Sequence, residues 1–233
     1  MKNMELAWAT LTSPTAAFAE LRERPRALLP LLLILLGTVI VVAWYYASVD
    51  FPWLVEHLLD ADPRTRNMPP AARAKAMGVM RLPILMGSSV IGAALVVMLM
   101  RGAEAAYFSL AGKITNVQYS FRHWFALTCW TALPHFFGIL VMAGFLLLSP
   151  TNQIGTEELQ LLSLNELFFH RTMGQPGYAL LSNLTLLSPW VWTLTVIGVR
   201  TWSGRSWLFS TFFALLPQIL IYGIWAAFAL RSA

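Results

Sequence analysis

The sequence predicts an all-α fold, a polytopic transmembrane helical bundle of five spans. Hydrophobic residues make up 58% of the 233-residue chain and charged residues only 12%, whereas soluble domains are about 45–50% apolar. About 20 apolar residues in a helix cross the roughly 30 Å hydrocarbon core, and only a helix satisfies its own backbone within lipid. Five apolar stretches meet this requirement, at 27–48, 82–111, 124–148, 179–199 and 207–230.

The basic residues between these stretches predict an orientation. Nine of the 16 Lys and Arg residues fall on the side of the N-terminal arm, and seven fall on the opposite side. The basic flank of the first span and the tight turn from Arg200 to Arg205 favour a cytoplasmic N-terminus and an outside C-terminus. The net charge of +5 fits loops placed against anionic lipid. We therefore expect membrane lipids, and no nucleic acid, as partners.

The first 26 residues predict short amphipathic helices on the cytoplasmic interface, ahead of a single transmembrane domain over 27–233. Ser13-Pro14 has the form of an N-cap followed by proline at the first helical position, and Pro25 ends the helix. Apolar residues recur at helical spacing on both sides of this start, at Met4, Trp8 and Leu11 and then at Phe18 and Leu21. Such stripes are typical of interfacial helices. A frayed terminus is the alternative.

The loops predicted to lie outside also carry structural signals. In the first, residues 71–80 predict a helix. The third loop, residues 149–178, contains a capping-box pattern, Ser163 with Glu166, just ahead of an apolar run. Four residues of this loop are candidates for docking a partner: Leu161, Leu164, Leu167 and Phe168. The segment either lies on the outer leaflet or a partner, or packs against the protein's own spans.

Two of the spans carry similar sequences. Aligning Arg122 with Arg205 gives eight identities in 26 positions without a gap. The shared anchors are Arg122, Trp124 and Pro134 in one copy and Arg205, Trp207 and Pro217 in the other. Spans three and five run in the same direction, which indicates a parallel repeat of two hairpins, spans two–three and four–five. Each copy should begin with a basic residue and an interfacial tryptophan and then kink near its proline.

A polar residue follows each repeat proline, His135 in one copy and Gln218 in the other. Both lie roughly 20 Å along the helix from the repeat arginine, at a depth where polar side chains usually face the bundle interior. As hydrogen-bond partners between helices they would contribute about 0.6–2 kcal/mol each. The alternative is a pair that senses protons or substrate.

Other polar residues within the spans have simpler interpretations. Arg101 and Glu104 are three residues apart, so they share a helix face and are expected to pair. This predicts an ion pair at the cytoplasmic end of the second span, with a transport carboxylate as the alternative. Asn183 in the fourth span suits close helix packing.

Motifs for catalysis are absent from the sequence. It contains no Walker loop, no His-Glu-x-x-His and no Gly-x-Ser-x-Gly. Its single cysteine, Cys129, and four scattered histidines give no pattern of zinc ligands. We therefore expect no enzymatic activity, no metal and no cofactor.

Motifs along most of the chain resemble those of the Yip family of five-span membrane proteins. Its opening is resembled by Ser13-Pro14, Phe18, Pro25 and Leu29-Pro30. Its middle section is resembled by Gly112-Lys113, Tyr119 and Pro134, and its last hairpin by Trp192, Gly198, Ser206 and Pro217. The resemblance covers nearly the whole chain and identifies a short, bacterial-type member.

The resemblance implies an integral protein of the bacterial inner (plasma) membrane. Eukaryotic members interact with Rab-type GTPases, whereas some short bacterial members occur alongside MacB-like ABC exporters and their periplasmic adaptors. This implies a non-enzymatic accessory or scaffold subunit of an ABC-type export assembly. Its partners would be an ABC permease or ATPase, an adaptor, or a second copy in a homo-oligomer. The alternative is a transporter, or a protein handling lipids or hydrophobic molecules, that uses the interface between the two hairpin repeats.

Overall fold

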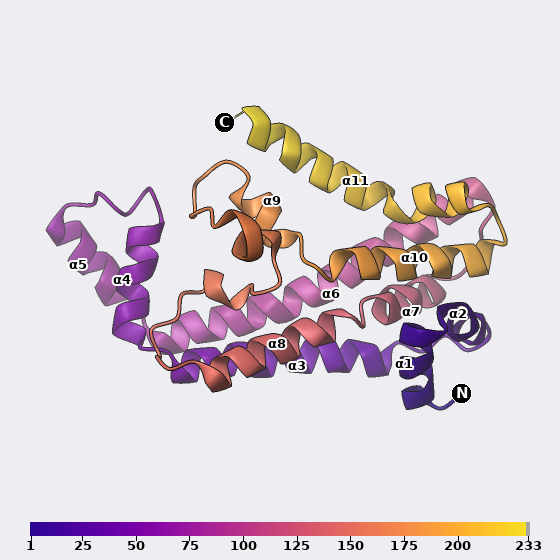
Figure 1. Ribbon diagram of the computed structural model, residues 1–233, viewed down its shortest axis with the longest axis horizontal. Helices are drawn as coiled ribbons and strands as arrows, with labels where there is room; N and C mark the ends of the chain where they lie inside the picture. The colour runs from indigo at the N-terminus through magenta and orange to yellow at the C-terminus, as the bar shows by residue number, and fades with distance from the viewer. Residues whose placement is uncertain (232–233) are drawn as a thin grey trace. The chain divides into compact units, whose positions relative to one another are not determined.

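The computed structural model describes residues 1–231, which are mostly helical, as predicted (Figure 1). The helices are α1 Asn3–Thr12, α2 Pro14–Glu23, α3 Leu28–Ser48, α4 Phe51–Ala61, α5 Pro70–Val79, α6 Leu82–Thr115, α7 Phe121–Thr131, α8 His135–Leu148, α9 Tyr178–Asn183, α10 Ser188–Ser203 and α11 Trp207–Arg231. Two short turns, η1 Glu157–Leu159 and η2 Asn165–Phe169, lie between α8 and α9. Within the described residues no strand forms, and one isolated antiparallel bridge pairs Ser163 with Thr185.

The chain divides into two compact units. The first unit comprises residues 1–37, 95–137 and 187–223. The second unit comprises residues 38–94, 138–186 and, within the described residues, 224–231. The N-terminal helices and the loops after α6 and α10 therefore belong to the first unit. The two long loops, residues 49–81 and 149–178, belong to the second unit.

Three helices are long and apolar enough to cross a membrane, namely α3, α6 and α11. Helices α7 and α8 qualify together as one broken span, bent by 41°. These helices match four of the predicted spans and make the chain an integral membrane protein. The 34-residue α6 extends beyond the predicted end at 111.

The predicted span at 179–199 is wrong as one continuous helix. Helix α9 ends at Asn183, and α10 begins only at Ser188 and has 16 residues. Between them the backbone pairs with the third loop. The Leu164 amide donates to the carbonyl of Leu184, and the Leu186 amide donates to the carbonyl of Leu162. A bridging backbone cannot continue the helical hydrogen-bond pattern. The count of five spans and the hairpin repeat therefore stay predictions.

The two repeat prolines have different surroundings. Pro134 lies in the break between α7 and α8, where the bend is 41°, so the first expected kink is present. Pro217 lies inside α11, which continues through it as one helix. A proline removes only one backbone donor, and packing decides whether the helix breaks there.

An aromatic core fills the first unit. The side chain of Trp124 is fully buried, with ring centroids 5.4 Å from Phe108, 5.2 Å from Trp202 and 5.8 Å from Phe213. The indole of Trp202 donates to the carbonyl of Phe18 at 2.8 Å. Trp124 and Trp202 are thus core residues, and the prediction of Trp124 as an interfacial tryptophan is wrong. An indole at a span end suits either setting, because it combines a large apolar ring with one polar donor.

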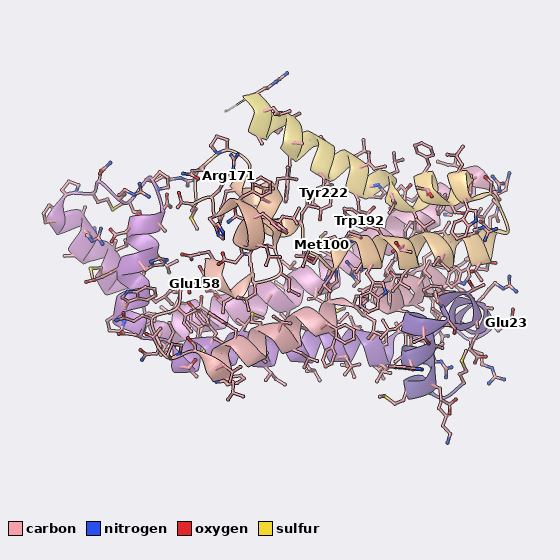
Figure 2. The ribbon with its side chains drawn as sticks, in the orientation of Figure 1. Glu23, Met100, Glu158, Arg171, Trp192 and Tyr222 are labelled. Carbon is pink, nitrogen blue, oxygen red and sulfur yellow. The ribbon has the colours of Figure 1, made fainter. Side chains whose placement is uncertain are left out.

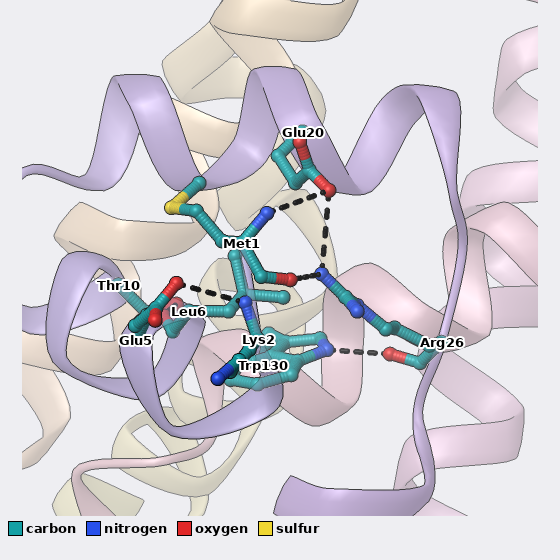
Figure 3. A network of polar contacts seen from close by, with 8 residues as sticks. All are labelled: Met1, Lys2, Glu5, Leu6, Thr10, Glu20, Arg26 and Trp130. Carbon is teal, nitrogen blue, oxygen red and sulfur yellow. Dashed lines mark hydrogen bonds and ion pairs between the residues drawn. The ribbon is translucent and has the colours of Figure 1, made fainter.

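Both predicted N-terminal helices are present, and a polar network fastens them to the first unit (Figure 3). The Glu20 carboxylate accepts the Met1 amino group and the Arg26 guanidinium, each at 3.3 Å. Arg26 also donates to the carbonyl of Met1 at 2.7 Å, and Trp130 of α7 donates to the carbonyl of Arg26 at 2.5 Å. Leu6 is buried beneath the network, whereas Met4 and Trp8 are exposed. The cytoplasmic location of these helices stays a prediction.

The second unit is built around two tyrosines of α3. The Tyr45 hydroxyl donates to the carbonyl of Ile154 in the third loop at 2.8 Å, and the Tyr46 hydroxyl lies 2.8 Å from that of Ser89 in α6. Helix α5 matches the predicted helix at 71–80. Helix α4 was not predicted, although Asp50 caps it by accepting from the Trp53 amide and Pro52 follows in its first turn. This is the same start signal that identified α2.

Candidate functional site

The ion pair predicted within α6 is present in the first unit. Nη1 of Arg101 lies 3.0 Å from Oε2 of Glu104, and their side chains are only 16% and 9% exposed. Burial removes most of the water that would otherwise solvate these charges, so each depends on its protein partners.

Gln218 joins this pair from α11. Its Nε2 donates to Oε1 of Glu104 at 3.1 Å. The side-chain amide oxygen of Gln218, Oε1, is buried and has no hydrogen-bond partner among residues 1–231. A buried acceptor without a partner costs free energy, so the cluster retains an unused hydrogen-bonding position.

Helix α7 completes the arrangement. Arg101 donates to the backbone carbonyl of Thr128 at 3.1 Å, and the Thr128 hydroxyl donates back to the carbonyl of Arg101 at 3.3 Å. We call Arg101, Glu104, Thr128 and Gln218 the polar cluster. Thr128 was not among the predicted site residues, although it is one of the identities in the repeat. The polar cluster ties α6 to both α7 and α11, and can stabilise the bundle or hold a polar group.

His135 does not pair with Gln218. It is the half-buried first residue of α8. No hydrogen bond within the described part of the chain joins the rings and amides of these two residues. Tyr222, one turn beyond Gln218, instead packs against Trp192 of α10 with ring centroids 5.9 Å apart (Figure 2).

The remaining predicted polar residues lie apart from the cluster. Asn183 is exposed at the end of α9 in the second unit, where its amide donates to the carbonyl of Ala179. Arg122 is exposed. Arg205 donates to the carbonyl of Thr115 at 2.6 Å, and Arg200 lies 4.0 Å above the Trp207 ring. Over residues 1–231, no three His, Cys, Asp or Glu side chains gather closely enough to hold a metal ion.

The third loop presents an apolar edge in the second unit, made of Leu167, Phe168 and Phe169. These side chains are 39%, 65% and 53% exposed, whereas Leu161 and Leu164 are half-buried. Phe169 was not among the predicted docking residues, although it directly follows Phe168.

Local hydrogen bonds hold this edge in place. The Ser163 hydroxyl accepts from the Glu166 amide at 3.1 Å, as the capping-box spacing predicts. The Asn165 side chain is buried and makes two bonds to the backbone of Arg171, each 3.0 Å long. The three apolar side chains are therefore exposed by a defined backbone.

Long apolar helices with a buried polar cluster define a helical integral membrane protein. The family model of the Yip1 domain matches residues 8–228. The chain therefore belongs to the Yip1-domain family, as its motifs predicted. No curated protein and no solved structure matches it.

Proposed function

We propose that this protein is a non-enzymatic accessory or scaffold subunit that docks on another membrane protein through the apolar edge at Leu167–Phe169. Three consecutive large apolar side chains exposed at one place carry this proposal. Buried aromatic and aliphatic anchors supply most of the energy of protein interfaces. Because Asn165 and Ser163 already fix the backbone, docking would cost little ordering entropy.

The partner in this proposal is an ABC-type, MacB-like export assembly of the bacterial inner membrane. Support for this identity comes from what the short bacterial members of the family imply. The proposal includes a cytoplasmic N-terminus, so that the third loop and its apolar edge lie outside, where a periplasmic adaptor or the permease can reach them. A homo-oligomer through the same edge is the competing assembly.

A native pull-down of tagged protein from its own membrane, read by mass spectrometry, tests this. The wild type should recover an ATPase–permease pair in stoichiometric amount. Phe168→Glu combined with Phe169→Glu should reduce recovery at least about 30-fold, since loss of a central anchor costs about 2 kcal/mol or more. Leu186→Glu is the matched control. Leu186 belongs to the second unit and is as exposed as Phe169, at 53%, but it lies outside the apolar edge.

Two outcomes would count against the proposal. Recovery of the wild type alone, as monomer or homo-oligomer, would overturn the accessory-subunit function. Recovery of the ATPase–permease pair with the double variant at wild-type yield would leave the partner in place and remove the apolar edge as the docking site.

A second candidate function is the handling of lipids or hydrophobic molecules within the bundle. The unpartnered Gln218 oxygen in the polar cluster favours it, because a translocating polar group needs a hydrogen-bonding position at membrane depth. Purified protein in liposomes should then move a fluorescent lipid between leaflets, and Gln218→Leu should slow this about tenfold. Asn183→Ala serves as control. Lipid movement no faster than in empty liposomes would refute this function.

A further inference from the structure

Two cavities lie next to each other in the second unit, one lined by several charged side chains and the other by none. A polar cavity of about 350 Å³ is lined by charged residues of α4, its following turn and the third loop, among them Arg66, Glu166 and Arg171. A groove of about 450 Å³ is lined by α9, the turn before it and the end of α11, with Leu180, Trp225, Phe228 and Ala229 as apolar wall. None of Leu167–Phe169 lines either cavity, although Glu166 and His170 on either side of them line the polar one.

Gly177 stands where the two cavities meet. A Cβ placed on it would lie 3.6 Å from Nη1 of Arg171, which lines the polar cavity, and 3.7 Å from Cβ of Ala229, which lines the groove. Its φ of +79° lies in the left-handed region that favours glycine. The guanidinium and the apolar wall therefore flank the same backbone position.

Two guanidinium groups line the polar cavity without a carboxylate partner. Among the described residues, no ion pair includes Arg66 or Arg171. Arg66 donates through Nε to the carbonyl of Asp60 at 2.8 Å, and Arg171 donates through Nη1 to the carbonyl of Pro176. Each keeps further N–H donors, and paired guanidinium donors match phosphate oxygens in geometry and charge.

Carboxylates line the same cavity. Glu157 is paired with His57, whose ring stacks on Trp53 with centroids 4.7 Å apart. The side chain of Glu166 makes no ion pair within residues 1–231. Tyr178 adds a phenol, and burial raises the pKa of Tyr178 above its ordinary value. The cavity therefore offers donors for an anion and acceptors for an ammonium group.

We propose that these two cavities bind one phospholipid whose headgroup carries a phosphate and a primary ammonium. The phosphate would lie on Arg171 and Arg66, the ammonium on Glu166, and an acyl chain in the groove beside α11. The polar cavity is lined by segments outside the spans, and one wall of the groove is formed by the spanning helix α11. This order of charge and apolar surface is that of a lipid at the membrane interface.

The full-length protein reconstituted in phosphatidylcholine vesicles tests the site. A trace of phosphatidylethanolamine carrying a photoreactive acyl chain is added, and the crosslinked residues are read by mass spectrometry. Labelling should fall on Leu180 and on Trp225–Ala229. Unlabelled phosphatidylethanolamine should compete with the probe about tenfold better than phosphatidylglycerol, whose headgroup has no ammonium.

Matched variants separate the headgroup from the chain. Arg171→Gln should reduce labelling about tenfold, whereas Arg64→Gln, in an exposed arginine that does not line the cavity, should not. Ala229→Phe should block the groove, with Ala227→Phe on the same helix as control. Glu166→Gln should abolish the preference for a primary ammonium over choline, which a merely structural role would not do.

Three results would overturn the proposal. The first is equal labelling by phosphatidylethanolamine and phosphatidylcholine probes in the wild type. The second is labelling that Arg171→Gln leaves unchanged although the variant retains the thermal stability of the wild type. The third is competition by soluble glycerophosphoethanolamine at the same concentration as the lipid, which would identify a free phosphoamine and not a membrane lipid as the ligand.

Discussion

Glu104→Ala should destabilise the protein by about 3–5 kcal/mol, the cost of leaving a buried charge without its partner. The change removes the carboxylate that holds Arg101 and accepts from Gln218. Arg101 would keep its bond to the carbonyl of Thr128, but a neutral carbonyl does not balance a buried positive charge. Thermal unfolding in detergent should show a fall in Tm of more than about 6 °C.

Two companion variants make this result specific. Glu23→Ala removes a carboxylate that is 72% exposed in its surface ion pair, and it should cost less than about 1 kcal/mol. The double variant Arg101→Met with Glu104→Leu should be more stable than Glu104→Ala, because no unpaired charge remains. If Glu104→Ala and Glu23→Ala unfold at the same temperature, the polar cluster does not stabilise the bundle.

Gly112→Ala should destabilise the protein by about 3 kcal/mol, near the upper end for overpacking. A Cβ on Gly112 would overlap the carbonyl oxygen of Val117, and the Val117 amide bonds to the carbonyl of Gly112 at 2.9 Å. Both contacts belong to backbone, so no side-chain rotation relieves the overlap. Trp124 packs on the same glycine, with Cζ2 at 3.6 Å.

Gly102→Ala is the matched control, because it makes the same change in the same helix. Nothing lies within 4 Å of a Cβ on Gly102. Alanine is favoured over glycine in a helix interior by up to about 1 kcal/mol, so this variant should be as stable as the wild type or more so. Circular dichroism melting of both variants checks the pair, and similar melting temperatures would refute the close approach at Gly112.

Helices α3, α6 and α11 could be predicted because their signal is local. A run of about 20 apolar residues needs no partner to indicate a span. The prediction of one continuous helix over 179–199 was wrong for the opposite reason. The backbone of Thr185 is taken up by pairing with Ser163, and hydropathy carries no information about such a pairing.

The polar cluster divides in the same way. The pairing of Arg101 with Glu104 follows from their spacing on one helix. The partner of Gln218 does not, because Glu104 is 114 residues away in the sequence. The interfacial prediction for Trp124 was wrong because a residue type alone does not tell a lipid-facing indole from one in a core. The two cavities also depend on segments that only the fold brings together.

The length of α6 has a consequence for the bilayer itself. Its 34 residues measure about 51 Å, and even a 40° tilt leaves about 39 Å along the membrane normal. The first 19 residues of α6, 82–100, carry no charged side chain, and they cover about 28 Å. Thickening the membrane by a few ångströms would bring the level of Arg101 and Glu104 into the hydrocarbon core, although both side chains remain buried in the bundle. The uncharged part of α6 therefore matches a hydrocarbon core slightly thinner than the usual thickness of about 30 Å.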